Sequence, residues 1–149
     1  MLNSDFKEFA ELLNANGVEY LLVGGYALAA HGHPRYTGDI DFWVSPDSAN
    51  VHRLLSALQA FGFGSLGLKV EDFGPDTVVQ LGQPPRRIDL LTAIDGVDFS
   101  GAWSRRVAFD ADGLRLHLIG VEDFKVNKRA SGRAKDLADL DALDPPEQR

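Results

Sequence analysis

The sequence predicts an α/β (α+β) fold, with a mixed, partly antiparallel sheet flanked by helices and a short C-terminal helical segment. Three observations lead to this expectation. Apolar runs of strand length, such as Tyr20–Val23, recur along the chain. Segments with apolar residues at helical spacing lie between them. An Asp-Gly pair at residues 112–113 is typical of a turn between two antiparallel strands.

Length and composition favour one domain over residues 1–149, with a core at about 4–119 and C-terminal helices at about 121–143. A chain of 149 residues has room for one hydrophobic core but not for two domains of ordinary size. No apolar run approaches the ~18 residues of a membrane span, and the N-terminus lacks a secretory signal. Because cysteine is also absent, we expect a cytoplasmic protein with no disulfide and no membrane partner. The net charge of −7 argues against broad binding of nucleic acid, which requires Lys and Arg to neutralise phosphates.

The N-terminal segment is expected to form an amphipathic helix over residues 4–16. Its apolar side chains fall on one face, Ser4 can cap its first turn, and Gly17 is expected to end it. The strand Tyr20–Val23 follows, and its four consecutive apolar residues predict burial on both faces of a sheet.

A glycine pair and two aspartates come next. Gly24-Gly25 precedes a short helix from Tyr26 to about His31, and a Pro-containing loop then leads to the strand Asp39–Val44. Because side chains alternate along a strand, Asp39 and Asp41 point to the same side, roughly 7 Å apart. Two negative charges on a rigid strand beside a glycine turn indicate a divalent metal with a phosphate-bearing ligand. Trp43 shares this face, and it is expected either to pack at the sheet edge or to stack on a base.

The remaining elements follow from periodicity and turn residues. Up to residue 91 they are a helix that starts at Ser45-Pro46-Asp47 and reaches Phe61, a loop over residues 62–76, and strands Thr77–Leu81 and Arg87–Leu91. After residue 91 we expect a short irregular or helical piece at Phe99–Trp103 and strands at Arg106–Phe109 and Leu114–Ile119. A helix from Val121 to about Ser131 follows, and a last helix after Gly132 ends near Leu143.

Gly24-Gly25 and Asp39-Ile40-Asp41 together resemble the signature of the nucleotidyltransferase superfamily named after DNA polymerase beta. In that signature a glycine pair follows a strand, a helix comes next, and Asp-x-Asp lies on the next strand. The forms GGYA and RYTGDID around these residues look most like the small bacterial members, the minimal nucleotidyltransferases and the AbiEii-type proteins of toxin–antitoxin systems. The resemblance implies a nucleotidyltransferase fold.

The resemblance also implies a set of site residues. Two Mg²⁺ ions would be held by Asp39, Asp41 and Asp89, and these carboxylates are expected to be catalytic. Asp89 is included because residues 87–91 match the RhDhh part of the family pattern hRhDhh, in which h is a hydrophobic residue. Arg87 shares the face of Asp89, so a simple ion pair between the two is the alternative for Asp89. Lys128 falls on a lysine of the family pattern and is expected to be catalytic by stabilising the charge on leaving pyrophosphate.

Further residues are expected to bind the nucleoside triphosphate. Glycines at the turn let phosphates approach the backbone. Many relatives have serine at the position of Gly25, so a hydroxyl contact is missing there. The expected nucleotide-binding residues are Gly24, Gly25, Arg35, Thr37, Lys128 and Asp136. For Arg35 and Thr37 the alternative to nucleotide binding is a structural role as a cap. For the basic cluster from Lys125 to Lys135 the alternative is that it only forms a solvated helix face.

The expected reaction is transfer of a nucleoside monophosphate to a hydroxyl, with release of pyrophosphate. The acceptor would be a partner protein, an RNA 3′ end such as that of tRNA, or a small molecule, in a setting of the toxin–antitoxin type. About 150 residues leave no room for domains that hold a duplex DNA template. Two alternatives stay open: a non-enzymatic, antitoxin-like binding module that keeps the fold, and an antibiotic nucleotidyltransferase.

Overall fold

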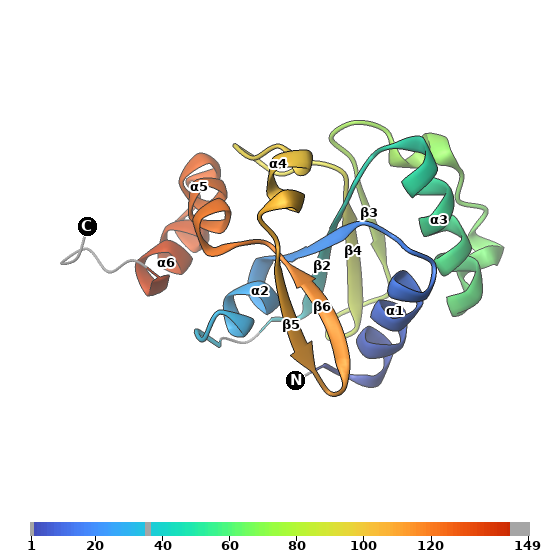
Figure 1. Ribbon diagram of the computed structural model, residues 1–149, viewed down its shortest axis with the longest axis horizontal. Coiled ribbons are helices and arrows are strands. Elements are labelled where there is room, and N and C mark those ends of the chain that lie inside the picture. Colours follow the sequence, from blue (N-terminus) through green and yellow to red (C-terminus); the bar gives the residue numbers. More distant parts are fainter. Residues whose placement is uncertain (1, 35–36, 144–149) are drawn as a thin grey trace.

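A computed structural model describes residues 2–34 and 37–143 and shows one six-stranded sheet with helices on both faces (Figure 1). The strands are β1 (Tyr20–Val23), β2 (Asp39–Val44), β3 (Val78–Leu81), β4 (Arg87–Leu91), β5 (Val107–Ala111) and β6 (Leu114–Leu118). The helices are α1 (Ser4–Ala15), α2 (Gly24–Ala30), α3 (Ser48–Leu58), α4 (Phe99–Ser104), α5 (Val121–Ser131) and α6 (Ala134–Leu143).

The sheet is mixed, as predicted, with the strand order β3-β4-β2-β1-β6-β5. The pairs β2–β4 and β1–β6 are parallel, whereas β1–β2, β3–β4 and β5–β6 are antiparallel. Asp112 and Gly113 both adopt positive φ angles, 54° and 78°, in the turn between β5 and β6. This conformation suits a tight hairpin, so the prediction from the Asp-Gly pair is confirmed.

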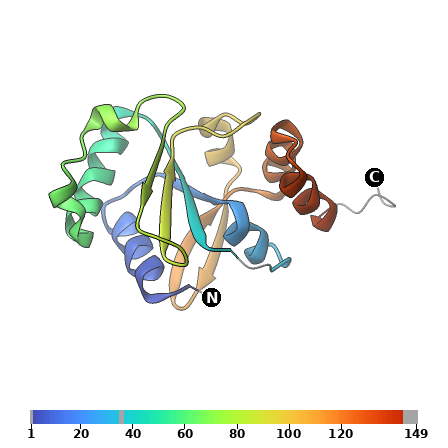
Figure 2. The ribbon, with the colours of Figure 1, turned by 180° about the vertical axis from the view of Figure 1, so that it is seen from behind.

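Two hydrophobic layers cover the two faces of the sheet. On one face, α1 and α3 pack on strand residues that include Leu22, Phe42 and Leu90 (Figures 1 and 2). On the other, α2, α4 and α5 contribute to a second cluster around Trp43. Trp43 is only 1% exposed, and its ring packs edge-on against Phe99 with 5.0 Å between the ring centroids. Of the two roles expected for Trp43, the structure therefore shows packing, but inside the sheet rather than at its edge, because β2 lies between β4 and β1.

Three local predictions were wrong. The α1 cap is Asn3, not Ser4: the Asn3 side chain accepts the Phe6 N–H at 2.9 Å, and asparagine caps as well as serine does. Helix α2 begins at Gly24 rather than at Tyr26. Gly24, with a φ of 67°, makes the change of direction from strand β1 to the helix by itself. The segment expected to be a loop contains helical turns at Gln59–Phe63, Gly64–Leu66 and Val70–Phe73.

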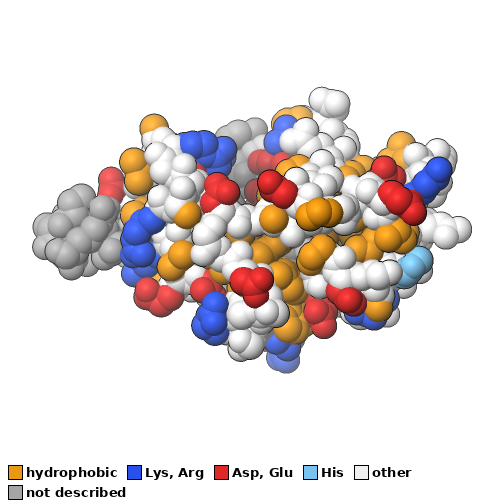
Figure 3. All heavy atoms as spheres, turned by 90° about the horizontal axis from the view of Figure 1, so that it is seen from above, with side chains coloured by type: hydrophobic (Ala, Val, Ile, Leu, Met, Phe, Trp, Pro, Cys, Tyr) orange, Lys and Arg blue, Asp and Glu red, His pale blue; other side chains and the backbone are white. Residues whose placement is uncertain are grey.

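The surface carries charges of both signs. On the face seen in Figure 3, Lys and Arg side chains are interspersed with Asp and Glu side chains, and hydrophobic side chains gather between them. Among the described residues, no helix combines the length and the apolar character needed to cross a bilayer.

Candidate functional site

Three carboxylates converge where β2 and β4 run side by side. The two strands pair in parallel, with Asp41 opposite Asp89 and Asp39 opposite Arg87. One carboxylate oxygen from each of Asp39, Asp41 and Asp89 lies within 4.8 Å of the other two. The strand of Asp89 therefore adjoins the strand of Asp39, a pairing that the sequence left open.

Arg87 pairs with two of these carboxylates. Its Nη2 donates to Asp39 Oδ2 at 2.9 Å, and its Nε donates to Asp89 Oδ1 at 3.0 Å. The Arg87–Asp89 ion pair considered from the sequence is thus present. It coexists with the carboxylate cluster, because the same guanidinium bridges Asp39 and Asp89 at the edge of that cluster.

The crowding of negative charge changes the proton affinity of the carboxylates. Burial, reinforced by the charges of Asp39 and Asp89, raises the pKa of Asp41 to about 7. The Lys135 ammonium opposes this rise in the Asp41 pKa. Burial also raises the pKa of Asp89. At Asp39 burial acts in the same direction, but hydrogen bonds with Asp89 and Arg87 outweigh it and hold the pKa of Asp39 below its usual range. A cation at this cluster would relieve the repulsion.

The glycine turn lies against the carboxylates. A Cβ at Gly24 would collide with the carboxylate of Asp41, and the φ of 67° there also favours glycine. A Cβ at Gly25 would lie 3.0 Å from the Cβ of Thr37, so Thr37 occupies the space of a side chain at that position. The Thr37 hydroxyl donates to the Asp39 backbone carbonyl at 2.9 Å, which is the structural role considered for this residue. Arg35 lies outside the described residues.

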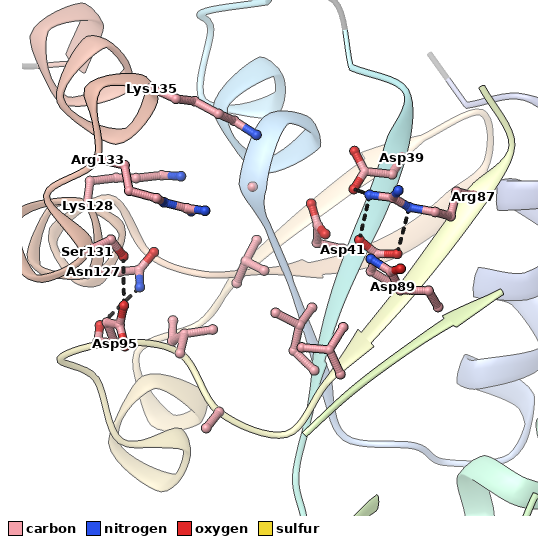
Figure 4. A pocket seen from close by; sticks show the side chains of 17 residues that line it. Asp39, Asp41, Arg87, Asp89, Asp95, Asn127, Lys128, Ser131, Arg133 and Lys135 are labelled. Atoms are coloured by element: carbon pink, nitrogen blue, oxygen red, sulfur yellow. Dashed lines mark hydrogen bonds and ion pairs between the residues drawn. The ribbon is translucent and has the colours of Figure 1, made fainter. Parts of the chain in front are cut away.

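A cleft of about 380 Å³ separates the carboxylates from α5 and α6 (Figure 4). Its volume lies within the usual range of small-molecule sites, roughly 300–1,000 Å³. Gly24 lines the cleft together with the three aspartates and Arg87 on one side. The lining of the opposite side comes from Asp95 and from residues of the α5–α6 region, namely Asn127, Lys128, Ser131, Arg133 and Lys135.

Lys128 lies on this second wall, but its ammonium group is engaged with acidic side chains. Its Nζ is 3.2 Å from Asp136 Oδ1 and 3.3 Å from Asp139 Oδ2. The Lys128 side chain is 7% exposed and the Asp136 side chain is completely buried. Asp136 also accepts from Arg133 Nε at 2.7 Å and is not among the residues that line the cleft. The structure thus brings Lys128 and Asp136 together as a buried ion cluster between α5 and α6.

Several cleft residues were not singled out from the sequence. Arg133 and Lys135 appeared only as part of the basic cluster from Lys125 to Lys135, and Asp95, Asn127 and Ser131 were not considered as site residues. Asn127 Nδ2 donates to the Asp95 carbonyl at 3.0 Å, and Ser131 Oγ donates to Asp95 Oδ2 at 3.2 Å. The sequence indicated that a helix ends at Gly132, but it did not indicate that Lys135, in the next helix, faces the carboxylates.

Comparisons with known proteins agree with this architecture. A structure from Thermotoga maritima, named as a candidate nucleotidyltransferase, superimposes with a TM-score of 0.57 at 12% identity, over 93% of this chain and 87% of that one. An antigenic nucleotidyltransferase-like protein from Paracoccidioides brasiliensis gives a TM-score of 0.56 at 18% identity, over 97% of this chain and 78% of that one. At these identities the likeness shows the fold. No curated protein gives a significant match to the chain.

The family itself is shown by a sequence model that spans nearly the whole chain. The model described as "Nucleotidyltransferase of unknown function (DUF6036)" matches residues 2–144. That match contains the glycine turn, all three carboxylates and both C-terminal helices. The chain therefore belongs to this family and is an enzyme of the nucleotidyltransferase class.

Proposed function

We propose that this protein transfers a nucleoside monophosphate from a nucleoside triphosphate to a hydroxyl acceptor, in a reaction that requires Mg²⁺. The observation that carries the proposal is the cleft with Asp39, Asp41 and Asp89 on one wall and basic residues on the other. Carboxylates suit a divalent cation, and ammonium and guanidinium groups suit phosphates. A metal-bound triphosphate requires both kinds of group in one site.

The residues present fit Mg²⁺. Mg²⁺ prefers hard oxygen ligands and keeps several of its waters, so a few carboxylates are sufficient. The three candidate oxygens lie within 4.8 Å of one another, and burial, reinforced by the charges of Asp39 and Asp89, raises the pKa of Asp41. A cation would stabilise the ionised form of this carboxyl group. Asp39, Asp41 and Asp89 would hold the ions, which would supply charge neutralisation on the phosphates and on the attacking oxygen.

The roles of the protein groups follow from their positions. Gly24 lets the Asp41 carboxylate lie directly against the backbone of the glycine turn, since any side chain there would meet that carboxylate. Asp89 is the proposed acceptor of the proton from the attacking hydroxyl. The hydroxyl oxygen then forms a bond to the α-phosphorus, the bond from that phosphorus to the bridging oxygen breaks, and pyrophosphate leaves. The basic residues that line the opposite wall of the cleft would stabilise the charge on pyrophosphate.

The size of the cleft bears on the acceptor. About 380 Å³ is near the lower end of small-molecule sites, so a nucleotide would use most of it. We therefore place the acceptor hydroxyl on a macromolecule that approaches from outside the cleft, a partner protein or an RNA 3′ end such as that of tRNA. A setting of the toxin–antitoxin type would supply such a partner. An antibiotic would require an additional enclosed pocket for the acceptor.

The test is nucleotide binding measured by calorimetry and thermal unfolding, with and without Mg²⁺, for each of the four nucleoside triphosphates. Wild type is expected to bind only with Mg²⁺. A hundredfold excess of ligand over Kd stabilises the native state by about 2.7 kcal/mol, or roughly 5–10 °C for a domain of this size. Asp39→Asn/Asp41→Asn is expected to lose this shift.

Asp110→Asn is a suitable control, because Asp110 is 71% exposed on β5, outside the cleft. A labelled triphosphate would then be used to search for the acceptor. Binding that does not depend on Mg²⁺, or that survives in the double variant, would contradict the proposed site. A folded wild type that binds none of the triphosphates would favour the binding-module alternative.

A further inference from the structure

The basic residues on the α5–α6 wall differ in how firmly they are already paired. Lys128 lies between two buried carboxylates, with its Nζ 3.2 Å from Asp136 and 3.3 Å from Asp139. Its ammonium also lies 5.0 Å from the centre of the Phe124 ring. To reach a phosphate, Lys128 would have to break two ion pairs inside the protein, which is energetically costly.

Arg133 is also engaged, although its side chain is 72% exposed. Its Nε donates to Asp136 Oδ2 at 2.7 Å, and its Nη2 donates to Asp136 Oδ1 at 3.3 Å. This fork holds the start of α6 against the ion cluster. Arg133 therefore contributes positive charge to the cleft while its guanidinium stays attached to Asp136.

Lys135 differs from both. It lies in the first turn of α6, lines the cleft, and extends from α6 toward the carboxylate wall in Figure 4. Its ammonium already acts electrostatically on Asp41 across the cleft. Within the part of the chain that the structure describes, Lys135 makes no ion pair. A cation in the first turn of a helix is electrostatically unfavourable, so the stability of α6 does not explain a lysine at this position.

We infer that Lys135, rather than Lys128, is the lysine that binds the triphosphate, and that Lys128 is a positioning residue that holds α6 so that Lys135 faces the carboxylates. This inference rests on the proposed function, because it names the phosphate-binding residue of that same cleft. Lys135 is exposed and lines the cleft, so its ammonium can bind a phosphate group without breaking a buried ion pair.

The test is calorimetric binding of inorganic tripolyphosphate and of ATP, each with Mg²⁺, to wild type, Lys135→Ala, Lys135→Arg and Arg129→Ala. Tripolyphosphate has no base or sugar, so it reports the phosphate contacts alone. We expect Lys135→Ala to weaken both ligands roughly tenfold or more, because a charged hydrogen bond is lost. Lys135→Arg should restore most of the affinity. The dependence of affinity on salt should also be smaller for Lys135→Ala.

Arg129→Ala is the matched control, because it removes the same charge from the exposed end of α5, where Arg129 does not line the cleft. Its affinities should stay within about twofold of wild type. Wild-type binding that persists in Lys135→Ala, or an equal loss in Arg129→Ala, would overturn this inference alone. Failure of wild type to bind either ligand would overturn the proposed function, and this inference with it.

Discussion

Arg87 already acts as a counter-ion for the carboxylates that are proposed to hold the metal. Its guanidinium bridges Asp39 and Asp89 at 2.9 and 3.0 Å, and its side chain is 31% exposed. A divalent cation bound by the same oxygens would lie close to this positive charge, and like charges at such short distances repel each other. Arg87 therefore lowers the repulsion among the carboxylates and at the same time competes with a metal for them.

Arg87→Gln is expected to tighten the binding of Mn²⁺ or Mg²⁺ in the absence of nucleotide by about tenfold, because the competing charge is removed. The affinity would be measured by calorimetry, and for Mn²⁺ by electron paramagnetic resonance, at one fixed pH. Arg86→Gln is the control, since Arg86 is next in sequence but pairs with Asp5 on α1. Weaker metal binding in Arg87→Gln would show instead that Arg87 is needed to hold the carboxylates in place.

The site residues that were predictable lie close together in sequence or follow strand alternation. Gly24, Asp39 and Asp41 belong to consecutive elements, and the face of Asp89 follows from its position in β4. The adjacency of β2 and β4 is a long-range pairing that alternation does not determine, so the sequence left it open. For Lys135 the missing information was how α6 folds back after Gly132. Helical periodicity predicts which residues share a face of a helix, but it does not predict which part of the protein that face meets.

At the scale of elements, α5 and α6 are joined by a buried ion cluster. Burial alone would raise the pKa of Asp136, but its hydrogen bonds with Arg133 and Lys128 outweigh burial and hold that pKa below the usual 3.8. A carboxylate whose pKa is lower in the folded state stabilises the fold above its unfolded pKa. This stabilisation is complete at neutral pH and disappears as the pH falls below about 3.8 through the lowered value.

Asp136→Asn is accordingly expected to destabilise the protein by about 3 kcal/mol at pH 7, because Lys128 loses one of its buried partners. Urea unfolding at several pH values would measure this, and the difference from wild type should shrink as the pH falls below 3.8. Glu122→Gln is the control, since Glu122 is an 85% exposed acid on α5. A difference that stays the same at all pH values would argue against an ionised Asp136 as the source of the stability.

At the scale of the whole molecule, the wall that faces the carboxylates is continuous with the core. Phe124 of α5 is 1% exposed and belongs to the same cluster as Leu21 of β1 and Trp43 of β2. Trp43 in turn follows Asp41 on the same face of β2. Both sides of the cleft are thus attached to one hydrophobic layer, and we expect α5 to unfold together with the sheet.

Phe124→Ala tests this coupling and with it the expectation of one domain. The substitution is expected to cost about 3–5 kcal/mol, because a large buried ring is lost and its space is filled only partly. Phe124→Leu, which removes less volume, should cost clearly less. Tryptophan fluorescence reports the layer around Trp43 and Phe99, and far-ultraviolet circular dichroism reports all the helices. If α5 and the sheet form one unit, the two signals should change at the same urea concentration within each protein. In both variants this shared midpoint should be lower than in wild type.

Separate transitions would mean that the C-terminal helices fold independently. The core would then not fix the position of the wall that faces the carboxylates.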